Sequence, residues 1–162
     1  MTVPAAPSGE QLDERVREIV ADHRDDRGAL LPVLHAVQTE FGCVSPEVIR
    51  LIAKELNLTR ADVHGVASFY RDFRKEPAGR STVRICRAEA CQAVGGRELA
   101  AAAQSQLGVD FGQTTSGGEV TLDEVFCLGN CALGPSVAVN GMTHGRVDAA
   151  RLSALVDQAR VR

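Results

Sequence analysis

Four of the five cysteines in this chain fall in two close pairs, and these pairs constrain its fold more than any other feature. Cys86 and Cys91 form a C-x4-C pair, and Cys127 and Cys131 form a C-x3-C pair. Each pair begins where a predicted strand ends, because strand-like runs lead into Cys86 and into Cys127. We therefore expect two cysteine-bearing loops to converge at one edge of a small sheet.

Four converging thiolates are the ligand set of a [2Fe–2S] cluster or of a structural zinc ion. Structural zinc commonly uses tight C-x2-C turns, whereas both loops here are longer. A two-iron cluster is wider than a single ion, and a separate thiolate pair for each iron suits longer loops. The spacing favours iron–sulfur over zinc but leaves both open. It disfavours a set of unrelated core thiols.

The residues around the two pairs suit an anionic group. Glycines let the backbone approach closely and can leave N–H groups pointing at sulfur, and four of them flank the pairs: Gly95, Gly96, Gly129 and Gly134. Arg87 lies between Cys86 and Cys91, where a cation would favour a more negative reduced state. A solvent-facing loop arginine is the alternative interpretation of Arg87.

The amino-terminal part of the chain has the apolar spacing of four short helices. Ser8 with Gln11 is typical of a capping box, and Thr59 with Asp62 marks the start of the fourth helix. Helices this short are marginal alone, so they must pack on each other or on a partner. The apolar positions at helical spacing are Leu12, Val16, Ile19, Val20, Leu30, Leu31, Leu34, Val37, Phe41, Val48, Leu51, Ile52, Leu56, Val63, Val66 and Tyr70.

The pattern changes at residues 75–80, a stretch with Pro and Gly that indicates a domain boundary. Beyond it the sequence predicts β–α–β–β–β–α, with a hairpin turn at Asn140-Gly141. We therefore predict an α/β protein with a helical bundle domain over residues 1–76, suited to partner docking. A second domain over residues 81–162 would carry the cysteine pairs.

Composition narrows the classes of function. The chain has 162 residues, 44% hydrophobic and 24% charged, and a net charge of −3, so a nucleic-acid surface is not expected. No apolar run reaches the length of a membrane span, which is roughly 18 residues. The start of the chain lacks the basic and apolar regions of a secretory signal, so we expect a cytoplasmic protein whose thiols stay reduced.

The sequence offers no catalytic constellation of its own. It has no Ser/His/Asp arrangement, no phosphate-cradling loop and no G-x-G-x-x-G after a strand. A thiol–disulfide enzyme of the thioredoxin type would need a C-x-x-C motif, which is absent. We expect a non-catalytic subunit rather than an enzyme that acts alone.

The two pairs, separated by thirty-five residues and followed by Gly134-Pro135 and a strand, resemble those of the thioredoxin-like [2Fe–2S] ferredoxins. These are the small iron–sulfur subunits of respiratory complex I and of soluble NAD-linked hydrogenases and formate dehydrogenases. The segments 30–42 and 64–70 resemble the helical amino-terminal domain of that family. Within it, residues 85–93 are most similar to the gamma subunit of the soluble molybdenum-dependent NAD formate dehydrogenase.

This resemblance implies one [2Fe–2S] cluster with Cys86, Cys91, Cys127 and Cys131 as its ligands, in a thioredoxin-like fold from about residue 81 onward. It implies a larger partner subunit that holds FMN and binds NAD, and, in the formate dehydrogenase branch, a molybdenum subunit. The equivalent subunit of complex I or of an NAD-reducing hydrogenase is the alternative. A zinc-stabilised docking module is a more distant one.

Four further residues and one segment call for an interpretation. We expect Cys43 to be a half-buried structural thiol and His35 to be a packed or surface histidine. His64 either contacts the flavin subunit or packs between helices, and the segment 68–70 either closes the helical core or contacts a partner. His144 follows the hairpin turn, where a titrating group near the cluster would couple to its redox state.

Overall fold

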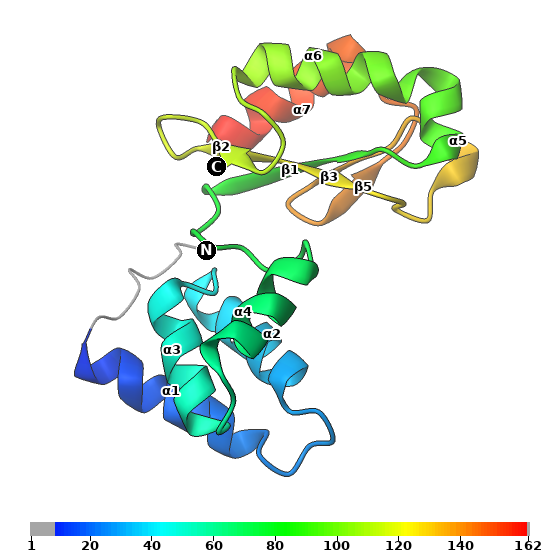
Figure 1. The fold of residues 1–162 in the computed structure, drawn as a ribbon. Coiled ribbons are helices and arrows are strands. Elements are labelled where there is room, and N and C mark those ends of the chain that lie inside the picture. Colours follow the sequence, from blue (N-terminus) through cyan, green and yellow to red (C-terminus); the bar gives the residue numbers. More distant parts are fainter. Residues whose placement is uncertain (1–8, 162) are drawn as a thin grey trace. The chain divides into compact units, whose positions relative to one another are not determined.

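The computed structural model describes residues 9–161 and divides into two compact units, with the boundary between Pro77 and Ala78 (Figure 1). The first unit is made of helices, and the second combines a sheet with helices. The predicted fold class, with helices preceding an α/β domain, is confirmed. Within the described range, no helix is both long enough and apolar enough to cross a membrane.

The helical unit contains four helices, whose bounds are α1 (Glu10–Asp22), α2 (Leu30–Phe41), α3 (Pro46–Glu55) and α4 (Arg60–Phe69). The start of α4 has the predicted capping box, because the Thr59 hydroxyl accepts from the Asp62 N–H at 3.1 Å while the Asp62 carboxylate accepts from the Thr59 N–H at 3.1 Å. The predicted cap at Ser8 lies outside the described residues; Gly9 is the cap of α1.

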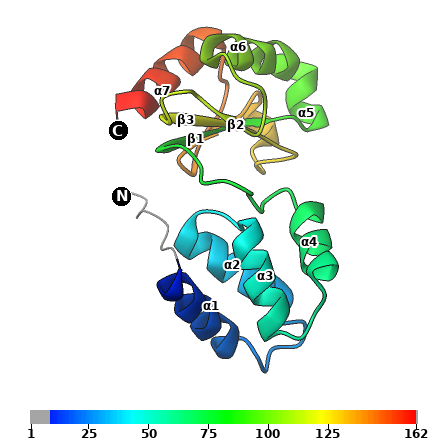
Figure 2. The ribbon, with the colours of Figure 1, turned by 60° about the vertical axis from the view of Figure 1, so that its left-hand side comes forward.

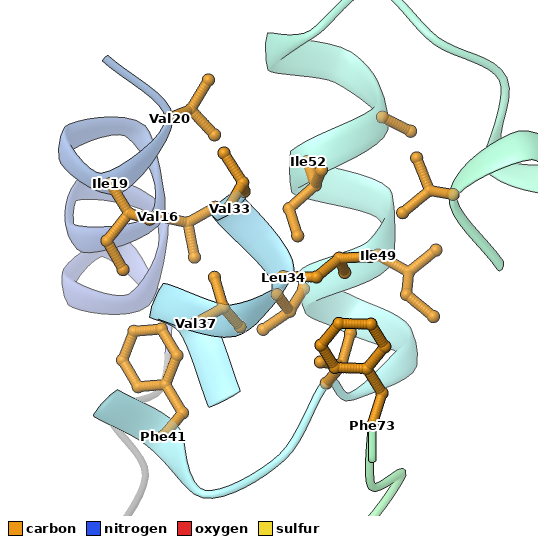
Figure 3. Close-up of a cluster of buried hydrophobic side chains, with 14 of the residues drawn as sticks. Val16, Ile19, Val20, Val33, Leu34, Val37, Phe41, Ile49, Ile52 and Phe73 are labelled. Carbon is orange, nitrogen blue, oxygen red and sulfur yellow. The ribbon is translucent and has the colours of Figure 1, made fainter. Parts of the chain in front are cut away.

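One hydrophobic core fills the helical unit, and Figure 3 shows its central side chains pointing toward one another from α1, α2 and α3. The predicted apolar stripes supply most of it, including Val16, Leu34 and Ile52, each fully buried. Phe73, which follows α4, also enters this core at 8% exposure. The sequence pattern did not predict that, because Phe73 lies outside any helical period.

The second unit is built on a five-stranded sheet with the order β2-β3-β1-β4-β5. Its strands are β1 (Ser81–Cys86), β2 (Gln113–Thr114), β3 (Val120–Val125), β4 (Val137–Val139) and β5 (Met142–His144). The central strand β1 and its neighbour β3 run parallel, with Cys86 opposite Val125. Parallel neighbours end at the same edge, so the chain leaves both strands there and enters the two cysteine loops.

Two helices, α6 (Arg97–Leu107) and α7 (Ala149–Val161), cover the same face of the sheet (Figure 2). They pack on each other and on the sheet through buried aliphatic side chains, among them Leu99, Leu152 and Val156. The predicted order of elements is confirmed, with four additions. These are the short strand β2, the single turn α5 (Glu89–Cys91), the wide turn η1 (Gln92–Gly96) and the short 3-10 turn η2 (Cys131–Leu133).

Candidate metal centre

The first cysteine pair is buried at the end of β1. Cys86 is the last residue of that strand, and α5 brings Cys91 back toward it. Their exposed fractions are 2% and 1%. The Cys86 N–H donates to the Ser136 carbonyl at 3.0 Å, so the first loop is fixed by the segment that follows the second pair.

The wide turn η1 directly follows Cys91 and contains two glycines, Gly95 and Gly96. Gly95 has φ 98°, a left-handed value that glycine adopts without strain. At Gly96 the backbone approaches so closely that a Cβ atom would lie 2.6 Å from the Cys91 carbonyl oxygen. The predicted role of this glycine pair in close backbone approach is therefore confirmed at Gly96, whose contact is with the Cys91 backbone rather than with a sulfur.

The second cysteine pair lies on the surface. Cys127 follows β3 after one residue, and Cys131 begins the short 3-10 turn η2 (Cys131–Leu133). The two sulfurs are 3.7 Å apart, and both residues are exposed. The Gly129 N–H donates to the Cys127 Sγ at 3.3 Å, as expected for a glycine that turns an amide toward sulfur. Cys127 has φ 130°, so the loop holds this residue in a strained conformation.

The two pairs lie close enough to interact electrostatically. Burial raises the pKa of the Cys91 thiol most, and the hydrogen bond with Cys86 raises it further. The hydrogen bond with Cys127 is the largest cause of the raised pKa of Cys131, and the charge of Cys86 in the first pair also contributes. Neighbouring thiols that resist ionisation in this way form a site that a cationic group would stabilise.

The four thiols lie in two pairs rather than around one point. Over residues 9–161, no group of three or more His, Cys, Asp or Glu side chains is arranged to hold a metal ion. Tetrahedral zinc would need four ligands around one point, whereas a [2Fe–2S] cluster takes two thiolates on each iron. All four cysteines are free thiols, one pair buried and one pair exposed.

Arg87 does not face open solvent. Its guanidinium lies 3.5 Å from the Glu124 carboxylate and 5.2 Å from the centre of the Phe111 ring. The side chain is half-buried between these two groups. The solvent-facing alternative is therefore wrong, and the charge of Arg87 is partly balanced by Glu124.

Cys43, His35 and His64 belong to the helical unit, whereas the two cysteine pairs belong to the sheet unit. Cys43 is fully buried at 6% exposure within the helical unit, more than the half-burial expected. His35 is exposed, with its ring 4.9 Å from Phe73, which confirms a packed surface histidine. His64 lines a cavity of about 240 Å³ in the helical unit.

His144 ends β5 in the second unit and pairs with Val137 in the sheet. It is half-buried, and its predicted coupling to a cluster stays a prediction.

The sequence did not predict the place of two polar residues, Ser136 and Asn130, at the site. Ser136 has an exposed fraction of 1% and contacts both loops. Asn130 lies between the second pair of cysteines and donates from Nδ2 to the Ser136 Oγ at 3.2 Å. A serine before a short strand carries no sequence signal of such a role, because only the fold brings it beside Cys91.

The fold and the paired thiols together define an iron–sulfur protein of the electron-transfer type. The chain matches the thioredoxin-like [2Fe-2S] ferredoxin family over residues 16–160, and it belongs to that family. Members of this family carry one [2Fe–2S] cluster, and the predicted cofactor is thereby confirmed. The match extends over the helical unit as well as the sheet unit.

Several curated relatives are named as subunits of NADH-quinone oxidoreductase. The chain is 39% identical over 130 residues to a subunit of NADH-quinone oxidoreductase from Mycobacterium tuberculosis, covering 80% of this chain and 52% of that protein. It therefore spans about half the length of the mycobacterial relatives. The match to a subunit of NADH-quinone oxidoreductase from Rhizobium meliloti is 35% identical over 149 residues, covering 92% of this chain and 89% of that one.

A solved structure shares the fold. A chain of an NAD+-reducing [NiFe]-hydrogenase, in the H2-reduced state, aligns with a TM-score of 0.67 at 22% identity. The alignment covers 82% of this chain and 22% of that chain. At this identity the likeness establishes the fold alone.

Proposed function

We propose that this chain is an electron-transfer subunit whose Cys86, Cys91, Cys127 and Cys131 bind one [2Fe–2S] cluster. The observation that carries the proposal is the meeting of a buried thiol pair and an exposed thiol pair at the edge where β1 and β3 end. When bound, such a cluster accepts and releases one electron at a time. We propose that the second domain, residues 81–162, holds the cluster.

The chain's own residues account for how such a centre would be held. Burial of Cys86 and Cys91 keeps water from one side, and the Gly129 amide donates to the Cys127 sulfur. Exposure of Cys127 and Cys131 leaves the other side open to a partner. We therefore propose that electrons enter and leave through the loop that carries the second pair.

The proposed partner is a larger subunit that holds FMN and binds NAD. Support comes from the names of the relatives, which are subunits of NADH-quinone oxidoreductase, and from the presence of the same fold in an NAD+-reducing hydrogenase. We propose that the helical domain, residues 1–76, docks to this partner. Phe69 and Tyr70 are 78% and 42% exposed, so they leave the core and are available for contact. The proposed location is the cytoplasm.

Two parent complexes are proposed, each on its own observation. Residues 85–93 resemble the gamma subunit of a molybdenum-dependent NAD formate dehydrogenase, which would add a molybdenum subunit. The curated relatives instead favour the corresponding subunit of NADH-quinone oxidoreductase. The subunits that co-purify with the tagged chain distinguish these: a molybdenum protein and formate-dependent NAD reduction support the first, and quinone reductase subunits support the second.

The electron-transfer role is tested directly by reduction of the anaerobically reconstituted full chain. NADH alone is expected to leave the visible spectrum unchanged. NADH together with the purified flavin subunit is expected to bleach it on the timescale of turnover. A chain that stays colourless after reconstitution and binds about one zinc per chain would instead support a docking module.

A further inference from the structure

The helical unit contains a cavity of about 240 Å³ between α3, α4 and the segment that follows α4. All of its lining residues belong to this one unit. Much of its wall is apolar and is formed by Val44, Ile49, Ala67 and Phe73. Pockets for small-molecule ligands usually measure roughly 300–1,000 Å³, so this cavity is better suited to one apolar side chain of a protein.

Hydrogen bonds hold the wall that follows α4 in place. The Gln38 side chain donates from Nε2 to the Asp72 carbonyl at 2.5 Å and accepts the Arg74 N–H at 2.6 Å. The Val44 N–H donates to the Arg74 carbonyl at 2.7 Å. The cavity is therefore preformed, and an occupant would bind without the entropic cost of ordering this segment.

Three aromatic rings connect the cavity with the surface. Phe73 forms part of the wall, and the ring of Tyr70 lies edge-on to it, with the centroids 6.1 Å apart. The ring of Phe69 lies edge-on to Tyr70 at 5.2 Å. Phe69 and Tyr70 are both exposed. Exposed aromatic side chains beside a pocket are typical of protein–protein contacts, which again indicates a protein as the occupant.

The polar part of the lining is basic. It includes His64, Arg74 and Lys75, and no acidic side chain among residues 9–161 lines the cavity. The chain as a whole has a net charge of −3, so this positive charge is a local feature. Complementary charge steers a partner and fixes how it docks, so a carboxylate is the group that this rim would favour.

We propose that this cavity is the docking site for a segment of the flavin subunit that inserts one apolar side chain and places a carboxylate near Lys75. The proposal rests on the proposed function, because it takes the flavin subunit as the partner. The apolar wall receives the side chain, and the basic rim attracts the carboxylate. Phe69 and Tyr70 extend the contact beyond the cavity.

The first test fills the cavity and measures the affinity of the reconstituted full chain for the purified flavin subunit by calorimetry. Ala67→Phe adds a ring from α4 and removes no side chain from the core. We expect the affinity to fall about tenfold or more, because the inserted side chain loses its place. The matched control is Ala61→Phe, at an exposed position of α4 that does not line the cavity, and it should bind normally.

The second test reverses the charge of the rim. Lys75 is exposed, so Lys75→Glu should leave the fold intact. We expect its affinity to be about tenfold lower than that of the unmodified chain at low salt, because two carboxylates would then face each other. The difference should shrink as salt is added and screens them. Arg50→Glu changes the net charge equally at an exposed position of α3 outside the cavity, and should bind normally.

The outcomes separate the two levels of inference. If the unmodified chain with its cluster does not bind the flavin subunit, the proposed partner fails. If it binds, and either Ala67→Phe or Lys75→Glu binds as tightly as its control, the partner stands and this docking site is overturned. If circular dichroism shows that Ala67→Phe does not fold, Lys75→Glu decides in the same way.

A small amphipathic carboxylate is the alternative occupant, and octanoate is the probe for it. Octanoate binding to the unmodified chain that Ala67→Phe abolishes, together with an unchanged affinity of this variant for the flavin subunit, would overturn the proposal. Competition between octanoate and the flavin subunit for the unmodified chain would support it, since both would then occupy the same cavity.

Discussion

Each of the four paired cysteines is proposed as a cluster ligand, and each can be tested by a single substitution. Among residues 9–161, no three His, Cys, Asp or Glu side chains are grouped so as to hold a single metal ion. Cys131 is the most informative of the four, because it is exposed and its substitution leaves the packed core intact. A change in cluster content at Cys131 therefore reports ligation rather than folding.

We predict that Cys131→Ser loses the cluster or sharply destabilises it, since a hydroxyl is a poorer iron ligand than a thiolate. The measurements are the visible spectrum and the iron and sulfide content after anaerobic reconstitution. Cys43→Ala is the matched control and should keep both, because Cys43 belongs to the helical unit. An intact cluster spectrum in Cys131→Ser would remove this residue from the ligand set.

The buried Cys43 thiol should make the stability of the helical unit depend on pH. Burial raises the pKa of its thiol, and the nearby charge of Glu76 raises it further. The folded chain therefore holds this proton more tightly than the unfolded chain, whose thiol has a pKa of about 8.5. The stabilisation is complete below about pH 8.5 and is lost as the pH rises through the folded pKa.

Urea unfolding of the helical unit, followed by circular dichroism at neutral and alkaline pH, measures this loss. Cys43→Ala should decline less over the same range, because it has no thiol to ionise. The prediction is contradicted if the two proteins lose the same free energy of unfolding between the two pH values.

At the scale of elements, the turn formed by α5 and η1 is the part of the site that depends most on one small residue. It returns the chain from Cys86 to the start of α6 and leaves Cys91 buried against the sheet. Gly96 makes this possible because no side chain separates it from the Cys91 backbone. A larger residue must displace the turn.

We predict that Gly96→Ala lowers cluster occupancy several-fold, because its Cβ would lie 2.6 Å from the Cys91 carbonyl oxygen and 2.8 Å from its carbon. Gly108→Ala, at the other end of α6, is the control. It has a left-handed φ of 66° but open space around it, so it should cost about 1 kcal/mol of stability and leave occupancy unchanged. Equal iron content in both variants would show that the turn tolerates the change.

The second loop has its own support, from the segment between β5 and α7. The Arg146 N–H donates to the Leu133 carbonyl at 2.6 Å, and the Val147 N–H donates to the Pro135 carbonyl at 3.0 Å. A Cβ atom on Gly145 would lie 2.7 Å from the Leu133 Cβ. These contacts hold η2 and the residues after it against the sheet unit, which explains how an exposed loop keeps a defined shape.

At the scale of the whole molecule, much of the architecture was predictable because it follows from the spacing of apolar residues and from helix-cap and turn residues. The apolar stripes, the cap at Thr59 and the hairpin at Asn140-Gly141 are all local signals. The positions of the two cysteine pairs after β1 and β3 followed from the same kind of signal. Parallel pairing of those strands then brings the pairs together.

What escaped prediction depends on contacts between distant segments. Strand β2 has only two residues and forms by pairing with β3, so it leaves no alternation to detect. Ser136 looks like any serine before a strand until the fold places it beside Cys91. The exposure of Phe69 and the burial of Phe73 are likewise set by how the chain turns after α4.

The exposed side chain of Phe69 allows the proposed docking of the helical domain to the flavin subunit to be tested. Its ring is 78% exposed and stacks edge-on against Tyr70 at 5.2 Å, so Phe69→Ser should leave the stability of the helical unit nearly unchanged. If the helical domain docks as proposed, affinity for the flavin subunit should fall about tenfold or more, as measured by calorimetry. Leu58→Ser, an exposed apolar change just before the opposite end of α4, is the control and should bind normally.

An unchanged affinity in Phe69→Ser would move the proposed docking surface away from this end of α4. The cluster assignment would be unaffected, because it rests on the second unit alone.

The most direct measurement is low-temperature EPR of the anaerobically purified full chain, before and after dithionite, with iron and sulfide counted. We predict a brown protein with about two irons and about two sulfides per chain that is EPR-silent as oxidised and gains a spin-half signal on reduction. A colourless protein that contains zinc, and that gains no spin-half signal after reconstitution with iron and sulfide, would contradict the electron-transfer function.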